Sequence, residues 1–241
     1  MIRTTSGITN DGSADVTLAI QALIDEIATN AEGGTLIFLP GTYLLNHTQG
    51  LLIHGKITLR AMEDGDKIEA KGEGKPIIKR GPSRGQFHRL FSIRDLRELW
   101  NGEFREVDMS TAVKIRNLIF DGNLLQQAGY NGEAGHNIEH QAGIFAGNSD
   151  HYPSQSLQLE IDDCEFCNLG GDAIQLVSGI DAVIQRTKSE RCLRGTLTMT
   201  GNKSVVVARD WEAKPHWQKQ PNGEYRLTDF VNHELDASKV R

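Results

Sequence analysis

Hydrophobic and polar residues alternate along much of the chain, and the alternation returns every 23 residues between positions 157 and 207. Each copy contains short alternating stretches separated by polar or glycine turns, a pattern typical of brief β-strands and not of helices. A repeat of this length predicts a solenoid in which successive coils stack side chain on side chain. The predicted columns are Leu159, Ala182 and Val205; Ile161, Ile184 and Val207; Ile174 and Leu197; and Leu176 and Met199.

An earlier copy of the repeat lies two steps upstream. Residues 113–120 match residues 159–166 at a spacing of 46 residues, so we expect an insertion in the coil between them. Downstream, Ser189 and Glu212 continue the column of Phe166. Because this continuation is polar, the regular coil is predicted to give way near residue 210.

Residues 15–28 carry a helical period instead, with Asp15 placed as an N-cap. Strands are predicted next at residues 35–39 and 42–45, on either side of a Pro-Gly turn. The first coil of a solenoid exposes apolar side chains and unpaired strand edges, so we expect the helix to cover that end. The apolar face of the helix consists of Val16, Ile20, Leu23 and Ile27.

Three segments resemble the pectate lyase superfamily. Residues 11–21 and then 33–43, Gly-Gly-Thr-Leu-Ile-Phe-Leu-Pro-Gly-Thr-Tyr, look like the opening of its members, and residues 164–174 are similar to its coil signature. The resemblance spans residues 11 to about 207. It implies an all-β fold: a right-handed parallel β-helix, a solenoid of coils of about 23 residues, with a short N-terminal capping helix.

The superfamily includes polysaccharide lyases, glycoside hydrolases, uronan epimerases and tailspike-type depolymerases of bacteriophages, and the fold does not select among them. The paired aspartates typical of polygalacturonases are only partly present, since Gly171-Asp172-Ala-Ile174 has glycine in place of one aspartate. The Asp-Pro-His constellation of alginate epimerases is absent from the sequence. The resemblance therefore implies a carbohydrate-active protein without assigning its reaction.

Length and composition are compatible with one domain over residues 1–241. We expect a helix cap at about 15–28, coils at about 35–210, and a C-terminal loop with a last strand at 211–241. The net charge of -6 gives no reason to expect nucleic acid as a partner, and no apolar stretch is long enough to span a membrane. No secretory signal is recognised, so the localisation stays open, with extracellular or virion-associated action compatible with a glycan partner.

Two long insertions, at about residues 121–141 and 209–228, are expected to reach the same sheet from the same corner and to form two walls of a groove. Between them, the residues just before each strand stack, and a strand spacing of about 4.8 Å brings Asp172 and Arg194 within side-chain reach. The candidate catalytic residues are Asp172, Arg194, Glu139 and His140. The candidate substrate-binding residues are His136, Gln175, Trp211, Trp217, Tyr225 and Glu234.

Each candidate has a structural alternative. Asp172 is a general acid or base, a cation ligand, or a turn aspartate bonded to backbone amides. Arg194 clamps an acidic sugar, acts as the base of a lyase, or forms a salt bridge to Asp172 or Glu190. Glu139 and His140 supply a carboxylate and a proton shuttle, or are plain loop residues. The aromatic residues of the second insertion stack on sugar faces or pack within their own loop.

Two hypotheses for function follow. The first is an enzyme that cleaves an acidic or complex polysaccharide, either by β-elimination near Arg194 or by hydrolysis with Asp172 and Glu139 or Glu234. The second is a non-catalytic glycan-binding or structural β-helix, such as part of a phage tail protein or a surface adhesin. A homo-oligomer is compatible with both, and a trimer with a tailspike-like protein.

No cofactor is assigned from the sequence, although the carboxylates of Asp162 and Asp163 offer ligands for calcium. Cys164 and Cys167 have the spacing of half a zinc site, but the second half is missing. We therefore expect Cys164 in the core, and Cys167 and Cys192 at half-buried positions.

Overall fold

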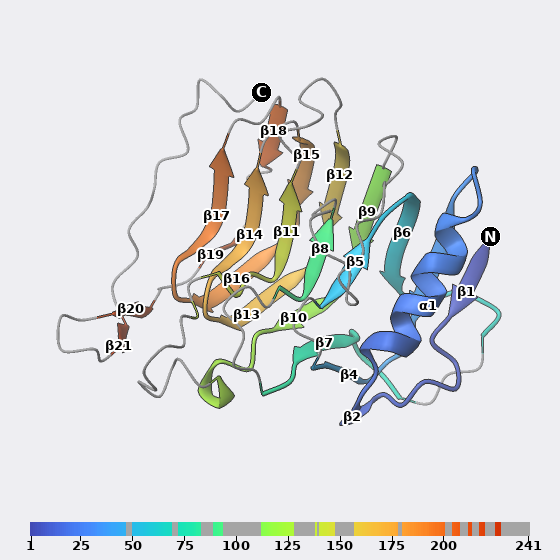
Figure 1. The fold of residues 1–241 in the computed structure, drawn as a ribbon, viewed down its shortest axis with the longest axis horizontal. Helices are drawn as coiled ribbons and strands as arrows, with labels where there is room; N and C mark the ends of the chain where they lie inside the picture. The colour runs from blue at the N-terminus through green and yellow to red at the C-terminus, as the bar shows by residue number, and fades with distance from the viewer. Residues whose placement is uncertain are drawn as a thin grey trace, which may run out of the picture.

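The structure is a computed structural model that describes residues 1–46, 50–68, 72–82, 89–93, 112–127, 138, 140–147, 157–177, 180–200, 204–207, 212–213, 217–219 and 225–227. Three parallel sheets enclose one interior, and an α-helix covers its N-terminal end (Figure 1). The chain visits the three sheets in turn, one strand in each, and this rotation makes one coil. Successive coils stack as a right-handed parallel β-helix, which confirms the predicted fold.

The strands of each sheet follow one another in chain order from one end of the stack to the other. Sheet A contains β1 (Ile2–Thr4), β3 (Gly34–Phe38), β6 (Lys56–Ala61), β9 (Ala112–Arg116), β12 (Leu157–Asp162), β15 (Ile180–Gln185) and β18 (Ser204–Val207). Sheet B contains β2 (Asp11–Asp15), β4 (Thr42–Leu45), β7 (Ile77–Arg80), β10 (Ile119–Asp121), β13 (Glu165–Leu169), β16 (Lys188–Cys192) and β19 (Glu212–Ala213). Sheet C contains β5 (Leu51–Ile53), β8 (Phe91–Ile93), β11 (Ile144–Gly147), β14 (Asp172–Val177) and β17 (Gly195–Thr200).

The strand register confirms the predicted columns. Leu159 pairs with Val113 on one side and Ala182 on the other, and Ile174 pairs with Leu197. The column of Phe166 departs from the prediction after Ser189, because Ser189 pairs with Ala213 and not with Glu212. The connection between β18 and β19 is one residue longer than the repeat, so the register slips at the position where the sequence pattern weakens.

The corner between sheets A and B repeats with the same period as the columns. Asn117, Asp163 and Arg186 have φ angles of 56°, 52° and 49°, the left-handed region that few non-glycine residues adopt. One residue in this conformation turns the chain sharply from one strand to the next. Because these residues recur at the spacing of the repeat, each of these coils turns from sheet A to sheet B in the same way.

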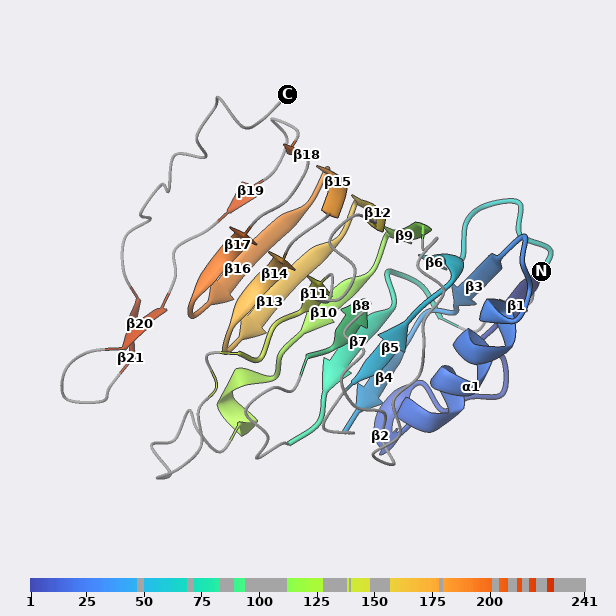
Figure 2. The same ribbon diagram turned by 45° about the horizontal axis from the view of Figure 1, so that its top comes forward.

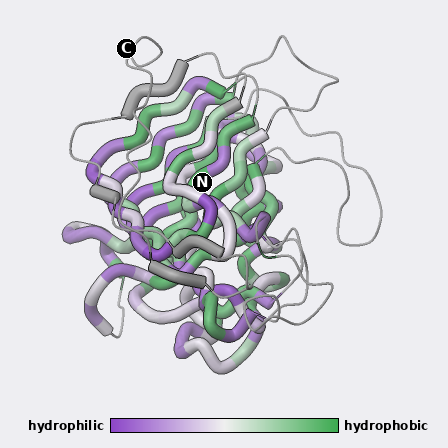
Figure 3. The backbone as a smooth tube through the Cα atoms, turned by 90° about the vertical axis from the view of Figure 1, so that its left-hand side faces the viewer, coloured by the Kyte–Doolittle hydropathy of each residue, from purple (hydrophilic) through white to green (hydrophobic). Residues whose placement is uncertain are grey.

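The interior is filled by the inward-facing residues of all three sheets. Figure 3 shows hydrophobic and polar positions alternating along neighbouring strands. The Phe120 and Phe166 rings stack at 4.8 Å between centroids, and Phe91 meets Phe120 edge-on at 4.9 Å. Because the side chains form columns, each coil packs mainly on the coils directly above and below it.

Helix α1 (Thr17–Ala28) takes, in the first coil, the place that a sheet C strand takes in later coils, since it follows β2 and precedes β3. The Gln21 amide donates to the Leu52 carbonyl at 3.0 Å and accepts from the Leu52 N–H at 2.9 Å. Leu52 lies on β5, the edge strand of sheet C. The side chain of Gln21 therefore supplies hydrogen bonds that a neighbouring strand would make, and the helix caps the sheet as expected.

The start of α1 differs slightly from the prediction. The N-cap residue is Val16, and Asp15 lies one position earlier, at the end of β2. The Asp15 carboxylate still accepts the backbone N–H of Thr17 at 3.0 Å, so it satisfies a helix N–H from outside the helix. It also accepts the N–H of Asn46 at 3.1 Å, which ties the helix start to the end of β4.

Beyond the last coil, β20 (Trp217–Lys219) and β21 (Tyr225–Leu227) form an antiparallel hairpin outside the three sheets (Figures 1 and 2). The last strand, expected after the second insertion and therefore beyond residue 228, lies outside the described residues. None of the helices in the described ranges has the length and apolar character needed to cross a membrane.

Candidate functional site

Three side chains meet at the amino-terminal end of the sheet C strands. The Arg194 Nε atom lies 3.7 Å from Asp172 Oδ2, and Arg194 Nη1 lies 3.2 Å from His140 Nδ1. Asp172 is only 1% exposed, whereas the Arg194 side chain is 38% exposed. The predicted approach of Asp172 to Arg194 is confirmed, and His140 joins them. A buried carboxylate thus holds a guanidinium group that faces solvent.

The stacking of coils brings these residues together. Asp172 begins β14, and Arg194 immediately precedes β17, the next strand of the sheet. The N–H of Gly171 donates to the Gln141 carbonyl at 3.1 Å, which brings the chain next to His140 into the same ladder. At Gly195 a Cβ atom would lie 3.0 Å from Asp172 Oδ1, so a side chain there would crowd the carboxylate.

Next to this cluster, in contact with Gln141, lies a charged residue that was not among the predicted site residues. Arg80 is completely buried and donates to Gln141 Oε1 at 3.1 Å, to the Gln141 carbonyl at 3.4 Å and to the Ala142 carbonyl at 3.1 Å. Burial lowers the pKa of Arg80 to about 9, against the opposing charge of Asp121. The burial of Arg80 could have been inferred from its position two residues after the apolar Ile78, because residues two apart on a strand share a face.

The outer face of sheet C continues from this cluster along the strands. Phe145 and Gln175 are register partners on β11 and β14, and neither belongs to the hydrophobic core cluster. The guanidinium carbon of Arg89 lies 3.4 Å from the centroid of the Phe145 ring. Gln175 was a predicted binding residue, whereas Arg89 and Phe145 were not. No motif distinguishes them, and only the register places the ring on the outer face.

Of the remaining predicted site residues, the structure describes two. His136, Glu139, Trp211 and Glu234 fall outside the described residues, so their roles stay predictions. Trp217 and Tyr225 lie on the two strands of the hairpin β20–β21 (Figure 2), with Trp217 opposite Leu227 and Tyr225 opposite Lys219.

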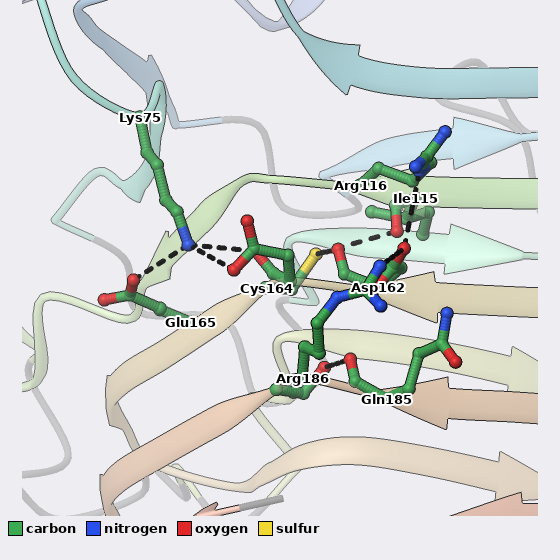
Figure 4. Close-up of polar contacts among 10 residues, drawn as sticks. Lys75, Ile115, Arg116, Asp162, Cys164, Glu165, Gln185 and Arg186 are labelled. Carbon is green, nitrogen blue, oxygen red and sulfur yellow. Dashed lines mark hydrogen bonds and ion pairs between the residues drawn. The ribbon is translucent and has the colours of Figure 1, made fainter. Parts of the chain in front are cut away.

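The acidic pair considered for calcium forms ion pairs instead. The Asp162 side chain is 3% exposed; it accepts a hydrogen bond from Arg186 and lies 3.6 Å from Arg116 Nε. Figure 4 shows both guanidinium groups converging on it. Asp163 lies across the corner, where the Lys75 ammonium donates to its carboxylate at 2.9 Å and to Glu165 at 3.0 Å. These carboxylates fit an ion-pair network that ties coils together, rather than a calcium site. Arg116 and Arg186 come from the two adjacent coils, and Lys75 comes from two coils earlier.

The cysteines are packing residues. Cys164 and Cys192 are fully buried, so the prediction of a half-buried Cys192 is wrong, while Cys167 is half-buried as expected. Burial raises the pKa of Cys164 and of Cys167 to about 12, and it raises the pKa of Cys192 as well. The thiolate, which is the nucleophile and the metal ligand, is therefore disfavoured at all three. Within the part of the chain that the structure describes, no group of three His, Cys, Asp or Glu side chains is placed to hold a metal ion.

The coil architecture and the sequence together define the class of the protein, a parallel β-helix of the pectate lyase type. The sequence model of the family described as "Rhamnogalacturonase A/epimerase, pectate lyase-like" matches residues 3–215, so the chain belongs to this carbohydrate-active family. Comparison with curated proteins gives no match.

Two solved structures resemble the fold. The A-module of the mannuronan C-5 epimerase AlgE6 from Azotobacter vinelandii is 19% identical, with a TM-score of 0.54, over 86% of this chain and 53% of that chain. The A-module of AlgE4 from the same organism is 16% identical, also with a TM-score of 0.54, over 90% of this chain and 56% of that chain. The chain thus spans about half the length of these structures. At such identities the likeness concerns the fold.

Proposed function

We propose that the chain binds an acidic polysaccharide on the outer face of sheet C and cleaves it by β-elimination. The observation that carries the proposal is the Asp172–Arg194–His140 cluster, in which a half-exposed guanidinium group contacts a buried carboxylate and an imidazole. Uronic acids are the sugars whose chemistry this cluster suits, because they carry a carboxylate next to the carbon that loses a proton. Membership of a carbohydrate-active family supports the same substrate class.

Each side chain has a role in the proposed reaction. Asp172 orients Arg194, and Arg194 binds the uronate carboxylate and stabilises the negative charge that develops there. The imidazole of His140 accepts the proton from C5. The electron pair of the broken C5–H bond then forms a C4–C5 double bond, and the C4–O bond to the next sugar breaks. A proton delivered to the departing oxygen completes the reaction.

The contact between Arg194 and His140 fits this sequence of events. In the free protein, Arg194 Nη1 lies at hydrogen-bond distance from Nδ1 of His140. A guanidinium group does not give up its proton near neutral pH, so the imidazole accepts this bond. A substrate carboxylate competes for the same N–H group. When it takes that N–H, the lone pair of Nδ1 becomes available as the base.

Hydrolysis has weaker support. It needs two carboxyl groups about 5 to 9.5 Å apart on either side of the scissile bond. Of the carboxylates considered for this role, Asp172 is the one described at the cluster, since Glu139 and Glu234 lie outside the described residues. The β-elimination mechanism uses groups that are in contact, and for this reason we prefer it.

The experiment is incubation of the purified protein with a panel of uronate-rich and capsular polysaccharides. Ultraviolet absorbance reports unsaturated products, and new reducing ends report any cleavage. β-Elimination predicts both signals from at least one uronate polymer. Reducing ends without unsaturated products would overturn elimination in favour of hydrolysis, and neither signal, with binding retained, would overturn cleavage altogether.

Matched variants locate the activity. We expect Arg194→Gln and Asp172→Asn to abolish product formation, because the first removes the carboxylate clamp and the second its buried counter-charge. Asp181→Asn is the control, since it makes the same change on sheet A, at the start of β15. If Asp181→Asn lowers the rate as much as Asp172→Asn, the cluster on sheet C is not the site.

A further inference from the structure

A flat aromatic platform lies on the outer face of sheet C. The Phe145 side chain projects from β11 outside the hydrophobic core cluster, yet Phe145 is only 9% exposed. Its ring lies over Gly147, where an added Cβ atom would come within 2.7 Å of the ring. Glycine at this position therefore leaves room for the ring next to the strand. A larger residue would displace it.

Arg89 covers this platform. Its guanidinium carbon lies 3.4 Å from the ring centroid, a cation–π contact at stacking distance. Arg89 comes two residues before β8, so the side chain reaches across to the neighbouring strand β11. A guanidinium group stacked by one face on a ring keeps the N–H groups of its edge in a fixed plane. This geometry suits a carboxylate bound by two parallel hydrogen bonds.

A polar side chain lies between the platform and the cluster at Arg194. Gln175 is the register partner of Phe145, and it lies three residues after Asp172 along β14. Its Oε1 atom is buried and has no hydrogen-bond partner among the described residues. Buried polar atoms are nearly always hydrogen-bonded, so this one calls for a partner. Rotation of the half-buried Gln175 side chain toward the surface of the sheet would present this atom to a sugar hydroxyl, which would provide a donor.

The distance between the Asp172–Arg194–His140 cluster and the Phe145 platform is one that a short glycan spans. From Asp172 to Phe145 is three residues along the strand and one strand across, which is on the order of 10 Å at about 3.3 Å per residue and about 4.8 Å per strand. A glycan of at least three sugars is needed to span this distance. Arg194 and Arg89 then offer one positive group to each of two uronate residues.

We propose that Arg89, stacked on Phe145, forms a second carboxylate-binding subsite of sheet C, and that Gln175 binds a hydroxyl between it and the site at Arg194. The inference rests on the proposed function, because it assumes that the substrate is an acidic glycan bound at Arg194. It adds a direction to that function, with the glycan running from the amino-terminal end of β14 toward Phe145. It also predicts that the subsite matters only for substrates long enough to reach it.

The test measures binding without turnover. In the His140→Asn background, which lacks the proposed base but keeps the Asp172–Arg194 pair, isothermal titration calorimetry compares a long uronate oligosaccharide with a disaccharide, with and without Arg89→Gln. We expect Arg89→Gln to weaken binding of the long oligosaccharide at least about tenfold, the factor expected for the loss of a charge-assisted hydrogen bond. Binding of the disaccharide should stay unchanged. Arg116→Gln, on sheet A, is the control and should leave both affinities as they are.

The ligand and a second variant separate the explanations. A carboxyl-reduced form of the same oligosaccharide should bind equally to both Arg89 forms, because it lacks the group that Arg89 recognises. Phe145→Leu should also weaken the long ligand, since it removes the ring that orients the guanidinium. Unchanged affinity of Arg89→Gln for the long acidic ligand would overturn the subsite while the proposed function stands. If the parent protein binds no acidic ligand of either length, both proposals fail.

Discussion

Arg80 provides a test of how a charge is held inside the β-helix. Its three hydrogen bonds reach two backbone carbonyls and the side-chain oxygen of Gln141. Each carbonyl has a second donor, the Gly171 N–H at the Gln141 carbonyl and the Leu90 N–H at the Ala142 carbonyl, both at 3.1 Å. In Arg80→Met, each of these two carbonyls therefore loses the hydrogen bond from Arg80 and keeps the one from the backbone N–H. The side-chain oxygen of Gln141 loses its bond to Arg80.

The magnitudes favour a small net effect for Arg80→Met. Loss of a partner by a buried acceptor costs about 1–3 kcal/mol. Replacing buried ionic groups by apolar side chains of similar size gains about 1–4 kcal/mol in the case of buried ion pairs, and we take the same range for the desolvation cost that Arg80→Met removes. The two terms oppose each other, so we expect the free energy of unfolding to stay within about 2 kcal/mol of the wild-type value. Arg80→Ala adds a cavity and should be lower than Arg80→Met by about 2–5 kcal/mol.

Urea unfolding followed by far-ultraviolet circular dichroism gives these free energies by linear extrapolation. Lys79→Met is the matched control, because Lys79 is the half-exposed neighbour of Arg80 on β7, and we expect a change of at most about 0.5 kcal/mol. A loss of more than about 4 kcal/mol for Arg80→Met would refute the reasoning. It would mean that the buried charge makes a large net contribution to stability.

Two further predictions concern the first coils. Gln21→Ala should lower the free energy of unfolding by about 2–3 kcal/mol, since two hydrogen bonds to Leu52 are lost at the edge of sheet C; the exposed Gln126→Ala serves as a control in the same urea titration, and equal losses would contradict the capping role. The hydrogen bonds from Arg60 hold the pKa of Asp66 at about 2, below its ordinary value of 3.8. This folded-state pKa is depressed, so the stabilisation is complete above about pH 4 and is lost as the pH falls through 2. The stability difference between wild type and Asp66→Asn should therefore be present at pH 7 and vanish near pH 2, and a difference independent of pH would exclude the linkage.

The coils could be predicted because a stacked solenoid repeats its side chains. Leu159, Ala182 and Val205 occupy equivalent positions in three coils, so their spacing gives the strand register directly. The strands β1 and β2 were not predicted, since each is short and largely exposed and neither carries the repeat. The slip at Ala213 was also missed, because a one-residue insertion lies outside any fixed period.

The candidate site was predictable to the extent that it depends on register. Aligning the coils placed Asp172 and Arg194 on neighbouring strands, and the structure brings them to 3.7 Å. The alignment gave no information on Arg89, because its side chain reaches across to the ring on the next strand. Arg80 was missed for another reason. A charged residue at the end of a strand is usually exposed, and its burial depends on backbone carbonyls from a later coil.

The most direct test of the account is a crystal structure of the His140→Asn variant, which keeps the Asp172–Arg194 pair, with a uronate oligosaccharide bound. We expect the sugar on the outer face of sheet C, with one carboxylate on Arg194 and the chain directed toward Phe145. Sugar bound instead on the outer face of sheet A, or at the hairpin β20–β21, with Arg194 left uncovered, would contradict the assignment of the site.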